Sequence, residues 1–567
     1  MKKLYILSAL ALAGVALTGC DDFLDDNRYP LSQQVVNASF WNNPVNVQNQ
    51  VNYFYEDYLG YGNATGSGAF YFTTLSDDQC GRTSMTNWNN QNVPTASSNW
   101  SGPYTEIRRA NLIIAGVEGS TLSESEKANF IAQARMHRAR QYFDLVKKYG
   151  DVPLVDRALD PADTEELYGP RIARNTVMDF VLADINYAVD NIALQSSKTE
   201  FSKDLAQAVK AEICLYEGSY ARYHQKDDAR AKTWFGYVVT AGEAIAARYP
   251  MCSDYTSLYK SFRTAGGGYD GLTNNQEVIF MKAYEKDVLM HSTGDYSSAS
   301  DGIAGITRDA FDSFLMLNGT LATGDAGVYD ADTKTVSIAN LLEVRDQRLA
   351  MTTYDHLIFQ GGQWAGPNTA PMWSMTGYGV AKYDNWTLPN SDNTTANKQY
   401  NCAPLFWGAR LYLAILEAKA ELGTLSDADL TTYMKPLWDR AGFTVAPTLA
   451  LLNGINDPAN HDGVSSLLWE IRRCRRNELM MDDGIRYWDL VRWHRLEKIS
   501  TDRGVAAVFQ GANISMVPET NIDTAFKNGY LDCTYGQARV WEDRQYFYPI
   551  PSDQIGLNEK LTQNPGW

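Results

Sequence analysis

The sequence contains few of the residues that build metal centres and disulfide frameworks. Its 567 residues include seven cysteines and six histidines. No cysteines form a CxxC pair, and the two that are nearest in sequence, Cys214 and Cys252, lie 38 positions apart. This spacing excludes a zinc ribbon or a disulfide-rich scaffold. Because the histidines form no HExxH motif and no i, i+4 pair, we expect no transition-metal centre.

Positive charge is also scarce. Fifty Lys and Arg residues stand against 67 Asp and Glu residues, which gives a formal net charge of −17. A field of this sign repels phosphate backbones, so we expect no nucleic-acid partner.

Common enzyme motifs are missing as well. The sequence has neither a GxxxxGKS/T phosphate loop nor a GxSxG nucleophile elbow. Gly266–Gly271 matches GxGxxG, but no strand pattern precedes it and no helix start follows, so it is interpreted as a flexible loop. We predict no catalytic residues and no cofactor. Whether two carboxylates face each other about 5 to 9.5 Å apart, as in glycosidases, is not visible in a sequence so rich in acids, and that alternative stays open.

Only one apolar run is long. Leu4–Leu17 has 14 residues, too few to cross the roughly 30 Å core of a bilayer as a helix. Two lysines precede this run, and it ends in Leu17-Thr18-Gly19-Cys20, which resembles a bacterial lipobox. We therefore expect residues 1–19 to be an export signal and Cys20 to be lipidated as the new N terminus. Several acyl chains together would hold the protein durably on a membrane.

The remaining composition is that of a folded protein, with 44% hydrophobic and 12% aromatic residues. At Ser123 a capping box with Glu126 opens an amphipathic run that stops at Gly150. Similar periodicity predicts further helices near 177–192, 205–220, 234–245, 404–423, 425–442, 464–481 and 485–496. Successive helices with short links predict a mostly α fold of tetratricopeptide-like hairpins.

The middle of the chain differs in composition from both ends. Residues 250–403 are rich in Gly, Asn, Asp, Ser and aromatics, which favours turns and long loops. We predict a single domain over 20–567, with a helical scaffold at 20–250 and 404–567 and a loop-rich insertion lobe at 250–403. Loops on a rigid scaffold are where binding surfaces tend to lie.

Several short motifs are spread along the chain from Cys20 to Trp567. They are Cys20–Asp25 followed by Pro30, Ala134–Arg135 with Arg138–Ala139 and Tyr142–Leu145, Tyr149–Val155, Asn274–Phe280, Arg476–Leu479, Gly484–Trp493, Tyr548–Pro551 and Gln563–Trp567. Together these motifs resemble the SusD/RagB family of outer-membrane lipoproteins. They occur in the family's order, and the last two are highly specific.

This resemblance implies a SusD-like fold, in which four tetratricopeptide-like helix pairs carry an irregular ligand-binding lobe. It implies a non-enzymatic lipoprotein of the Bacteroidetes outer membrane, lipid-anchored and facing the cell surface. Such a protein captures an oligosaccharide or polysaccharide and delivers it to a SusC-like TonB-dependent transporter. A peptide-binding member of the same family is the alternative, and a surface glycoside hydrolase is a further one. Whether a structural Ca²⁺ is bound cannot be read from the sequence.

A glycan site needs particular residue types. Sugars present C–H faces to aromatic rings and hydroxyls to forked polar groups, so the site combines exposed Trp or Tyr with Asn, Asp, Gln or Arg on loops. This combination occurs in the loop at 77–90 and in the insertion lobe. We expect the binding residues to be Asp78, Arg82, Trp88, Asn90, Tyr284, Tyr296, Trp364 and Trp373.

A cluster of four arginines, at 472, 473, 475 and 476, stands out near the C-terminal end. Glu470, Glu478, Asp482 and Asp483 flank it at helical spacing, which predicts local ion pairs on one helix. We interpret the cluster as structural. The aromatic residues of the tail, Tyr487, Trp488, Trp493 and Trp567, are expected in the core.

Overall fold

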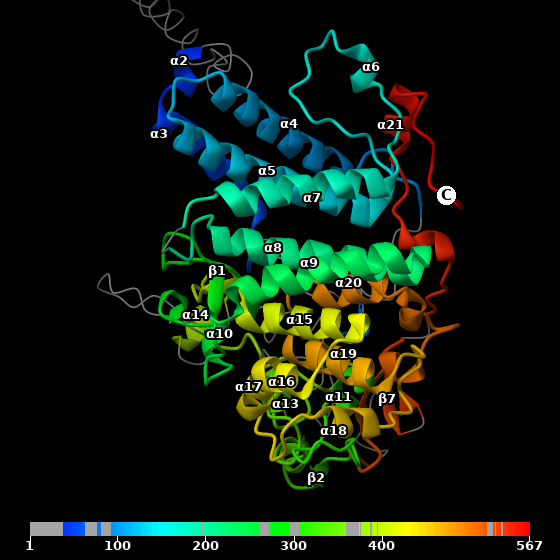
Figure 1. Cartoon of the computed structure of the whole chain (residues 1–567). Helices are drawn as coiled ribbons and strands as arrows, with labels where there is room; N and C mark the ends of the chain where they lie inside the picture. Colours follow the sequence, from blue (N-terminus) through cyan, green and yellow to red (C-terminus); the bar gives the residue numbers. More distant parts are fainter. Residues whose placement is uncertain are drawn as a thin grey trace, which may run out of the picture.

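The computed structural model describes most of the chain after its first 37 residues. Helices dominate, and the strands are few and short (Figure 1). No helix of the described part is both long and apolar enough to cross a bilayer. The described residues are 38–62, 76–80, 92–194, 197–260, 271–294, 305–358, 374, 376–385, 388–393, 395–518, 526–527, 529–534 and 537–567.

The long helices form a stack in which each packs against the next (Figure 1). Their facing side chains make one continuous hydrophobic core. This arrangement confirms the mostly helical fold predicted from periodicity. From the top of Figure 1 the stack runs through α4 (Ser98–Glu118), α5 (Glu124–Tyr149), α7 (Arg174–Asn191), α8 (Lys203–Tyr220), α9 (Asp228–Ala246), α15 (Gly408–Leu422) and α19 (Ser466–Glu478), with α20 (Ile485–Arg492) against α8.

Helix α5 shows how the sequence sets its own boundaries. The Ser123 hydroxyl accepts a hydrogen bond from the Glu126 amide, while the Glu126 carboxylate accepts one from the Ser123 amide, as the capping box predicts. Gly150 ends the helix at φ +72°, a conformation that favours glycine. A side chain there would also meet the Phe547 ring at 3.1 Å. The predicted helix is thus confirmed at both ends.

One predicted helix begins later than expected. Residues 404–407 belong to strand β4 (Ala403–Trp407), which pairs antiparallel with β1 (Val278–Lys282), and the helix starts at Gly408. All five residues of β4 are buried, and a short buried apolar run is compatible with a strand as well as with a helix. The strand gives way to the helix at Gly408. Glycine is favoured there, because a Cβ at this position would lie 2.4 Å from the Tyr249 carbonyl oxygen.

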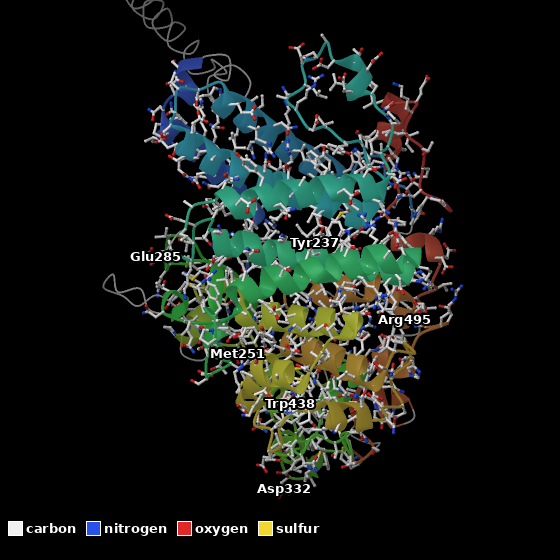
Figure 2. All side chains as sticks on the ribbon, viewed as in Figure 1. Tyr237, Met251, Glu285, Asp332, Trp438 and Arg495 are labelled. Carbon is white, nitrogen blue, oxygen red and sulfur yellow. The ribbon has the colours of Figure 1, made fainter. Side chains whose placement is uncertain are left out.

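Short elements fill the rest of the molecule. The β2–β3 hairpin, with Asp332 at its turn, lies at the end opposite α4 (Figures 1 and 2). The strands are β2 (Val328–Asp330), β3 (Thr335–Ser337) and the antiparallel trio β5 (Gln510–Asn513), β7 (Tyr530–Asp532) and β6 (Phe526–Lys527). The short helices are α2 (Ala38–Trp41), α3 (Pro44–Asn52), η2 (Tyr53–Asp57), α6 (Thr164–Leu167), η4 (Ala221–Gln225), α10 (Ser257–Lys260), η5 (Gly271–Thr273), α11 (Arg308–Asp312), α12 (Ala339–Leu342), α13 (Arg348–Thr352), α14 (Asn390–Asn393), α16 (Asp427–Asp429), η8 (Leu430–Met434), α17 (Lys435–Arg440), α18 (Leu449–Gly454), η9 (Leu496–Ile499), η10 (Ala506–Phe509), η12 (Asp543–Tyr546) and α21 (Ser552–Leu557).

The C-terminal segment lies beside the N-terminal helices (Figure 1). The Tyr548 amide donates to the Lys148 carbonyl at 2.6 Å, and the Asn564 side chain donates to the Tyr149 carbonyl at 3.1 Å. Arg171 donates to the Thr562 carbonyl at 2.9 Å. These bonds fasten residues 548–567 to the C-terminal end of α5 and to the segment before α7.

Candidate functional site

A pocket of about 410 Å³ with charged and aromatic lining residues lies beside α11 and α19. Three aromatic side chains line it, Trp469, Trp493 and Tyr530. The charged side chains that line it are Arg308, Arg345, Arg472, Arg473, Arg476, Arg486 and Lys498, with Asp309, Asp312, Asp325, Asp457 and Asp462. Its size and mixed chemistry suit one or two rings of a polar ligand.

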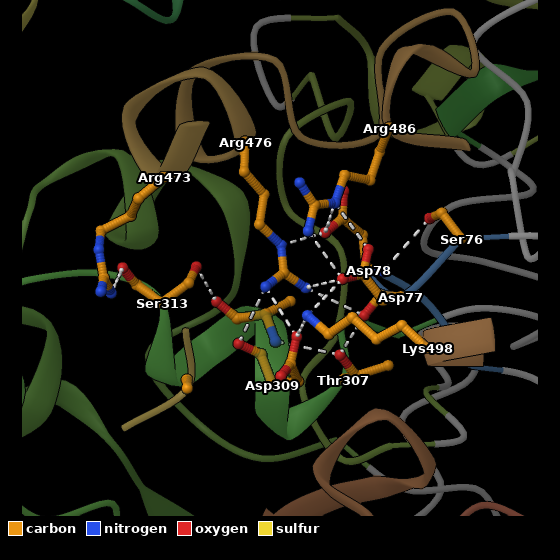
Figure 3. A network of polar contacts seen from close by, with 12 residues as sticks. Ser76, Asp77, Asp78, Thr307, Asp309, Ser313, Arg473, Arg476, Arg486 and Lys498 are labelled. Atoms are coloured by element: carbon orange, nitrogen blue, oxygen red, sulfur yellow. Dashed lines mark hydrogen bonds and ion pairs between the residues drawn. The ribbon is translucent and has the colours of Figure 1, made fainter. Parts of the chain in front are cut away.

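The wall of the pocket is tied to a buried ion network (Figure 3). Arg486 donates to both oxygens of Asp77, at 2.7 and 2.8 Å, and Arg476 donates to Asp78 at 2.6 Å. Lys498 Nζ bridges Asp77 Oδ2 at 2.7 Å and Asp309 Oδ2 at 2.9 Å. Three carboxylates therefore face three cations.

The network and its burial shift the pKa of each of its three acids. Burial alone would raise the pKa of Asp77, but Arg476, Arg486 and Lys498 hold it well below its ordinary value. The pKa of Asp309 is also lowered, because Lys498 and Arg476 outweigh its burial. The pKa of Asp78 is raised instead, since burial and the nearby Asp77 charge exceed the effect of Arg476.

The backbone of residues 76–80 is held by residues 305–307. The Thr307 amide donates to the Asp78 carbonyl at 2.9 Å, and the Thr307 hydroxyl donates to the Asp77 carbonyl at 2.7 Å. The Cys80 amide donates to the Gly305 carbonyl at 3.2 Å. This pairing fixes the backbone of residues 76–80, which immediately precede the predicted binding residue Arg82 in sequence.

Two half-buried aromatic residues line the pocket beside charged groups. Trp469 donates its indole N–H to Asp457 at 2.8 Å. The Arg308 guanidinium lies 3.7 Å above the Tyr530 ring, and the Tyr530 hydroxyl donates to Asp325 at 2.8 Å. Each ring is thereby held in one orientation. Fixed rings next to carboxylates and guanidinium groups are the residue types that a sugar site requires.

Two of the predicted binding residues are described by the structure, and both are buried. Asp78 is 1% exposed within the ion network. Tyr284 is also 1% exposed, and its hydroxyl donates to the Gly62 carbonyl at 2.5 Å. The expectation that these side chains face solvent is wrong, because each satisfies interior polar groups instead. The other predicted positions, Arg82, Trp88, Asn90, Tyr296, Trp364 and Trp373, lie outside the described residues, as does Cys20.

The arginine cluster is structural, as predicted, but its partners are mostly distant in sequence. Only Arg473 pairs locally, with Glu470 at 2.9 Å. Arg475 pairs with Asp489 at 2.9 Å and Arg472 with Glu421 at 3.2 Å. The expected local partners bind elsewhere: Glu478 to Arg348 and Arg440, Asp482 to Lys382, and Asp483 to Arg410. The prediction of pairs on one helix is therefore wrong for most of the cluster.

Sequence reasoning missed Trp469 and Tyr530. Both lie outside the loops that composition selected, Trp469 on helix α19 and Tyr530 on strand β7. The tail aromatics were predicted in the core, and Tyr487 and Trp493 are buried, whereas Trp488 and Trp567 are half-buried. When an aromatic residue lies on a helix or a strand, the sequence alone does not show whether its side chain lines a pocket or packs in the core.

Comparison with known proteins identifies the family. Residues 264–567 match the model described as "SusD family", and residues 22–215 match one described as "Starch-binding associating with outer membrane". The chain belongs to the SusD family, as its motifs suggested.

Relatives of known sequence agree with this assignment. A SusD-like protein of Bacteroides ovatus is 32% identical over 217 residues, a match that spans 36% of this chain and 37% of that protein. SusD-like protein P2 of Formosa agariphila is 23% identical over 476 residues, or 83% of this chain and 80% of that protein.

Solved structures share the fold. A SusD-like carbohydrate binding protein from Bacteroides fragilis NCTC 9343 matches with a TM-score of 0.67 and 20% identity, over 92% of this chain and 100% of that one. The surface glycan-binding protein A from Bacteroides fluxus matches with a TM-score of 0.58 and 16% identity, over 93% and 100% of the two chains.

Proposed function

We propose that this protein binds a glycan at the cell surface and passes it to a SusC-like TonB-dependent transporter without chemical change. The observation that carries the proposal is the pocket of about 410 Å³, with aromatic rings fixed beside charged groups, in a chain of the SusD family. Relatives of the same fold are named as carbohydrate-binding and surface glycan-binding proteins. An oligosaccharide is thus the ligand class that the site fits best.

The ligand surface would combine the pocket with the loop that follows Cys80. The ion network holds residues 76–80 against the pocket wall, and Arg82, Trp88 and Asn90 follow directly in sequence. Tyr296, Trp364 and Trp373 of the insertion lobe would add further stacking surfaces. Trp469 and Tyr530 would hold sugar rings within the pocket itself.

The predicted lipid at Cys20 would keep this surface at the outer membrane, the location named in the description of the matched N-terminal model. A TonB-dependent barrel would then receive the captured glycan. Copurification of such a barrel with the lipidated protein from detergent-solubilised outer membranes tests the partnership.

Affinity electrophoresis of the purified protein in gels containing single polysaccharides tests the binding function, with a peptide panel alongside. We expect one polysaccharide class to retard the protein, and Trp88→Ala and Trp469→Ala each to weaken affinity about tenfold, as for a central aromatic contact. Tyr168→Ala is the matched control, since that ring is 48% exposed and does not line the pocket.

The same experiment separates the alternatives. Peptide binding with no retardation by any polysaccharide would favour a peptide-binding member of the family. Release of reducing ends from a retarding polysaccharide would favour a glycoside hydrolase. Unchanged affinity in the Trp469→Ala protein would remove the pocket from the glycan site.

A further inference from the structure

Three side chains from separate elements converge at one end of the helix stack, away from the pocket. Asp57 ends η2, Glu106 lies on α4, and His137 lies on α5. One ligand atom from each of the three lies within 4.8 Å of the others. The three positions are far apart in sequence, so no spacing motif announces the group.

The distances within this group are informative. His137 Nε2 lies 3.3 Å from Asp57 Oδ2, 3.4 Å from Glu106 Oε2 and 3.4 Å from the Gln141 side-chain amide. These separations exceed the 2.7 to 3.2 Å of ordinary N–H···O hydrogen bonds. Two ligands held about 2.0 to 2.1 Å from a zinc ion at the tetrahedral angle lie about 3.3 to 3.4 Å apart, which is the spacing of His137 Nε2 from each of the two carboxylates.

The chemistry of the three groups fits the same ion. His137 is completely buried, and its ring stacks on the Phe54 ring at 3.9 Å, which holds the imidazole in place between the two carboxylates. Asp57 and Glu106 supply two negative charges to a divalent cation, and the Arg109 guanidinium also pairs with Glu106. Imidazole and carboxylate together are common zinc ligands.

Neighbouring groups hold the carboxylates in place. Arg109 Nη1 donates to both oxygens of Glu106, each at 2.5 Å, and Gln141 Nε2 donates to Asp57 Oδ2 at 2.6 Å. A carboxylate oxygen has two lone pairs, so each of these oxygens keeps one for the ion. Such supporting bonds orient metal-binding carboxylates in known sites. The group also opens to solvent, because Asp57, Glu106 and Gln141 line a groove of about 890 Å³ that would admit the ion and a water ligand.

We propose that Asp57, Glu106 and His137 form a zinc-binding site that ties η2 to the α4–α5 hairpin. The ion would take Asp57 Oδ2, Glu106 Oε2 and His137 Nε2 as protein ligands, with water from the groove in the fourth position. This site revises the expectation of no transition-metal centre, and it is independent of the glycan function.

Calorimetric titration of the metal-stripped, purified protein with zinc chloride tests the site. We expect one zinc ion per chain, and a tetrahedral absorption spectrum when cobalt replaces zinc. Glu106→Gln and Asp57→Asn should each weaken zinc binding at least tenfold while the circular dichroism spectrum stays that of the wild type. Both positions are partly exposed, so these near-isosteric changes avoid the cavity that His137→Ala would leave.

His356→Ala is the matched control. His356 is exposed and lies 2.7 Å from Asp355, so it offers a histidine and a carboxylate on the surface. Zinc binding should be unchanged in this variant. The proposal is overturned if the wild type binds no zinc, if Glu106→Gln and Asp57→Asn both bind it as tightly as the wild type, or if His356→Ala alone removes the binding.

Discussion

Replacing Asp77 by Asn should destabilise the protein strongly. Asp77 is completely buried and accepts hydrogen bonds from Arg486 and Lys498, while Arg476 lies 3.4 Å from it. The amide keeps the size of the side chain but removes its charge, so three cations face two carboxylates. Removing one partner of a buried ion pair costs about 3 to 5 kcal/mol, because a buried charge is left uncompensated.

Thermal unfolding followed by circular dichroism measures this loss. The entropy of unfolding is about 1.2 kcal/mol per kelvin for a chain of 567 residues, so the midpoint of thermal unfolding should fall by about 2.5 to 4 °C at pH 7. Asp439→Asn is the control, because Asp439 forms an exposed i, i+4 pair with Lys435 and should leave the midpoint unchanged.

The pH dependence gives an independent check. The pKa of Asp77 is held well below its ordinary value in the folded state, so its stabilising effect is complete above the unfolded pKa of about 4. As the pH falls below about 4, Asp77 of the wild type becomes protonated and its stabilising effect is lost. The difference in unfolding midpoint between the wild type and Asp77→Asn should therefore narrow. Equal midpoints at pH 7, or a gap that does not narrow in acid, would refute the reasoning.

Two further changes test the packing of α4 and the predicted anchor. Gly116→Ala should destabilise the protein by about 1 to 3 kcal/mol, because the added Cβ would lie 2.2 Å from the Trp41 ring. Gly102→Ala on the same helix is the control, since its Cβ would meet no atom within 4 Å and the change should be neutral or stabilising. Chemical denaturation measures the free energy of unfolding of both variants. A Gly116→Ala protein as stable as the wild type would contradict this packing. Cys20→Ser should abolish incorporation of labelled palmitate and release the protein from membranes, and a variant that is still labelled would show that the lipid is attached elsewhere.

Local signals predicted the helices well. The capping box at Ser123, the apolar repeat and Gly150 all act within one helix, so the sequence contains the information that sets α5. The strand at 403–407 was missed because its neighbour, β1, is more than 100 residues away and a buried apolar run fits either structure. Tertiary pairing decided between them.

The candidate site was less accessible to such reasoning. Arg476 reaches Asp77 and Asp78, about 400 positions earlier, although acids at helical spacing were available. Burial explains this choice, since a charge inside the protein needs fixed partners, whereas an exposed pair on one helix contributes little. Trp469 and Tyr530 look like ordinary members of a helix and a strand until the fold brings them to one pocket.

The bonds between residues 548–567 and the end of α5 also bear on the timing of folding. Asn564 and Tyr149 are 415 positions apart, and contacts of such separation form late because chain entropy opposes them. During synthesis α5 is made long before residues 548–567. The hydrogen bonds between the end of α5 and this segment therefore cannot form until the segment has been synthesised. In a chain exported by the signal predicted at residues 1–19, the contacts of residues 548–567 would therefore be among the last to form.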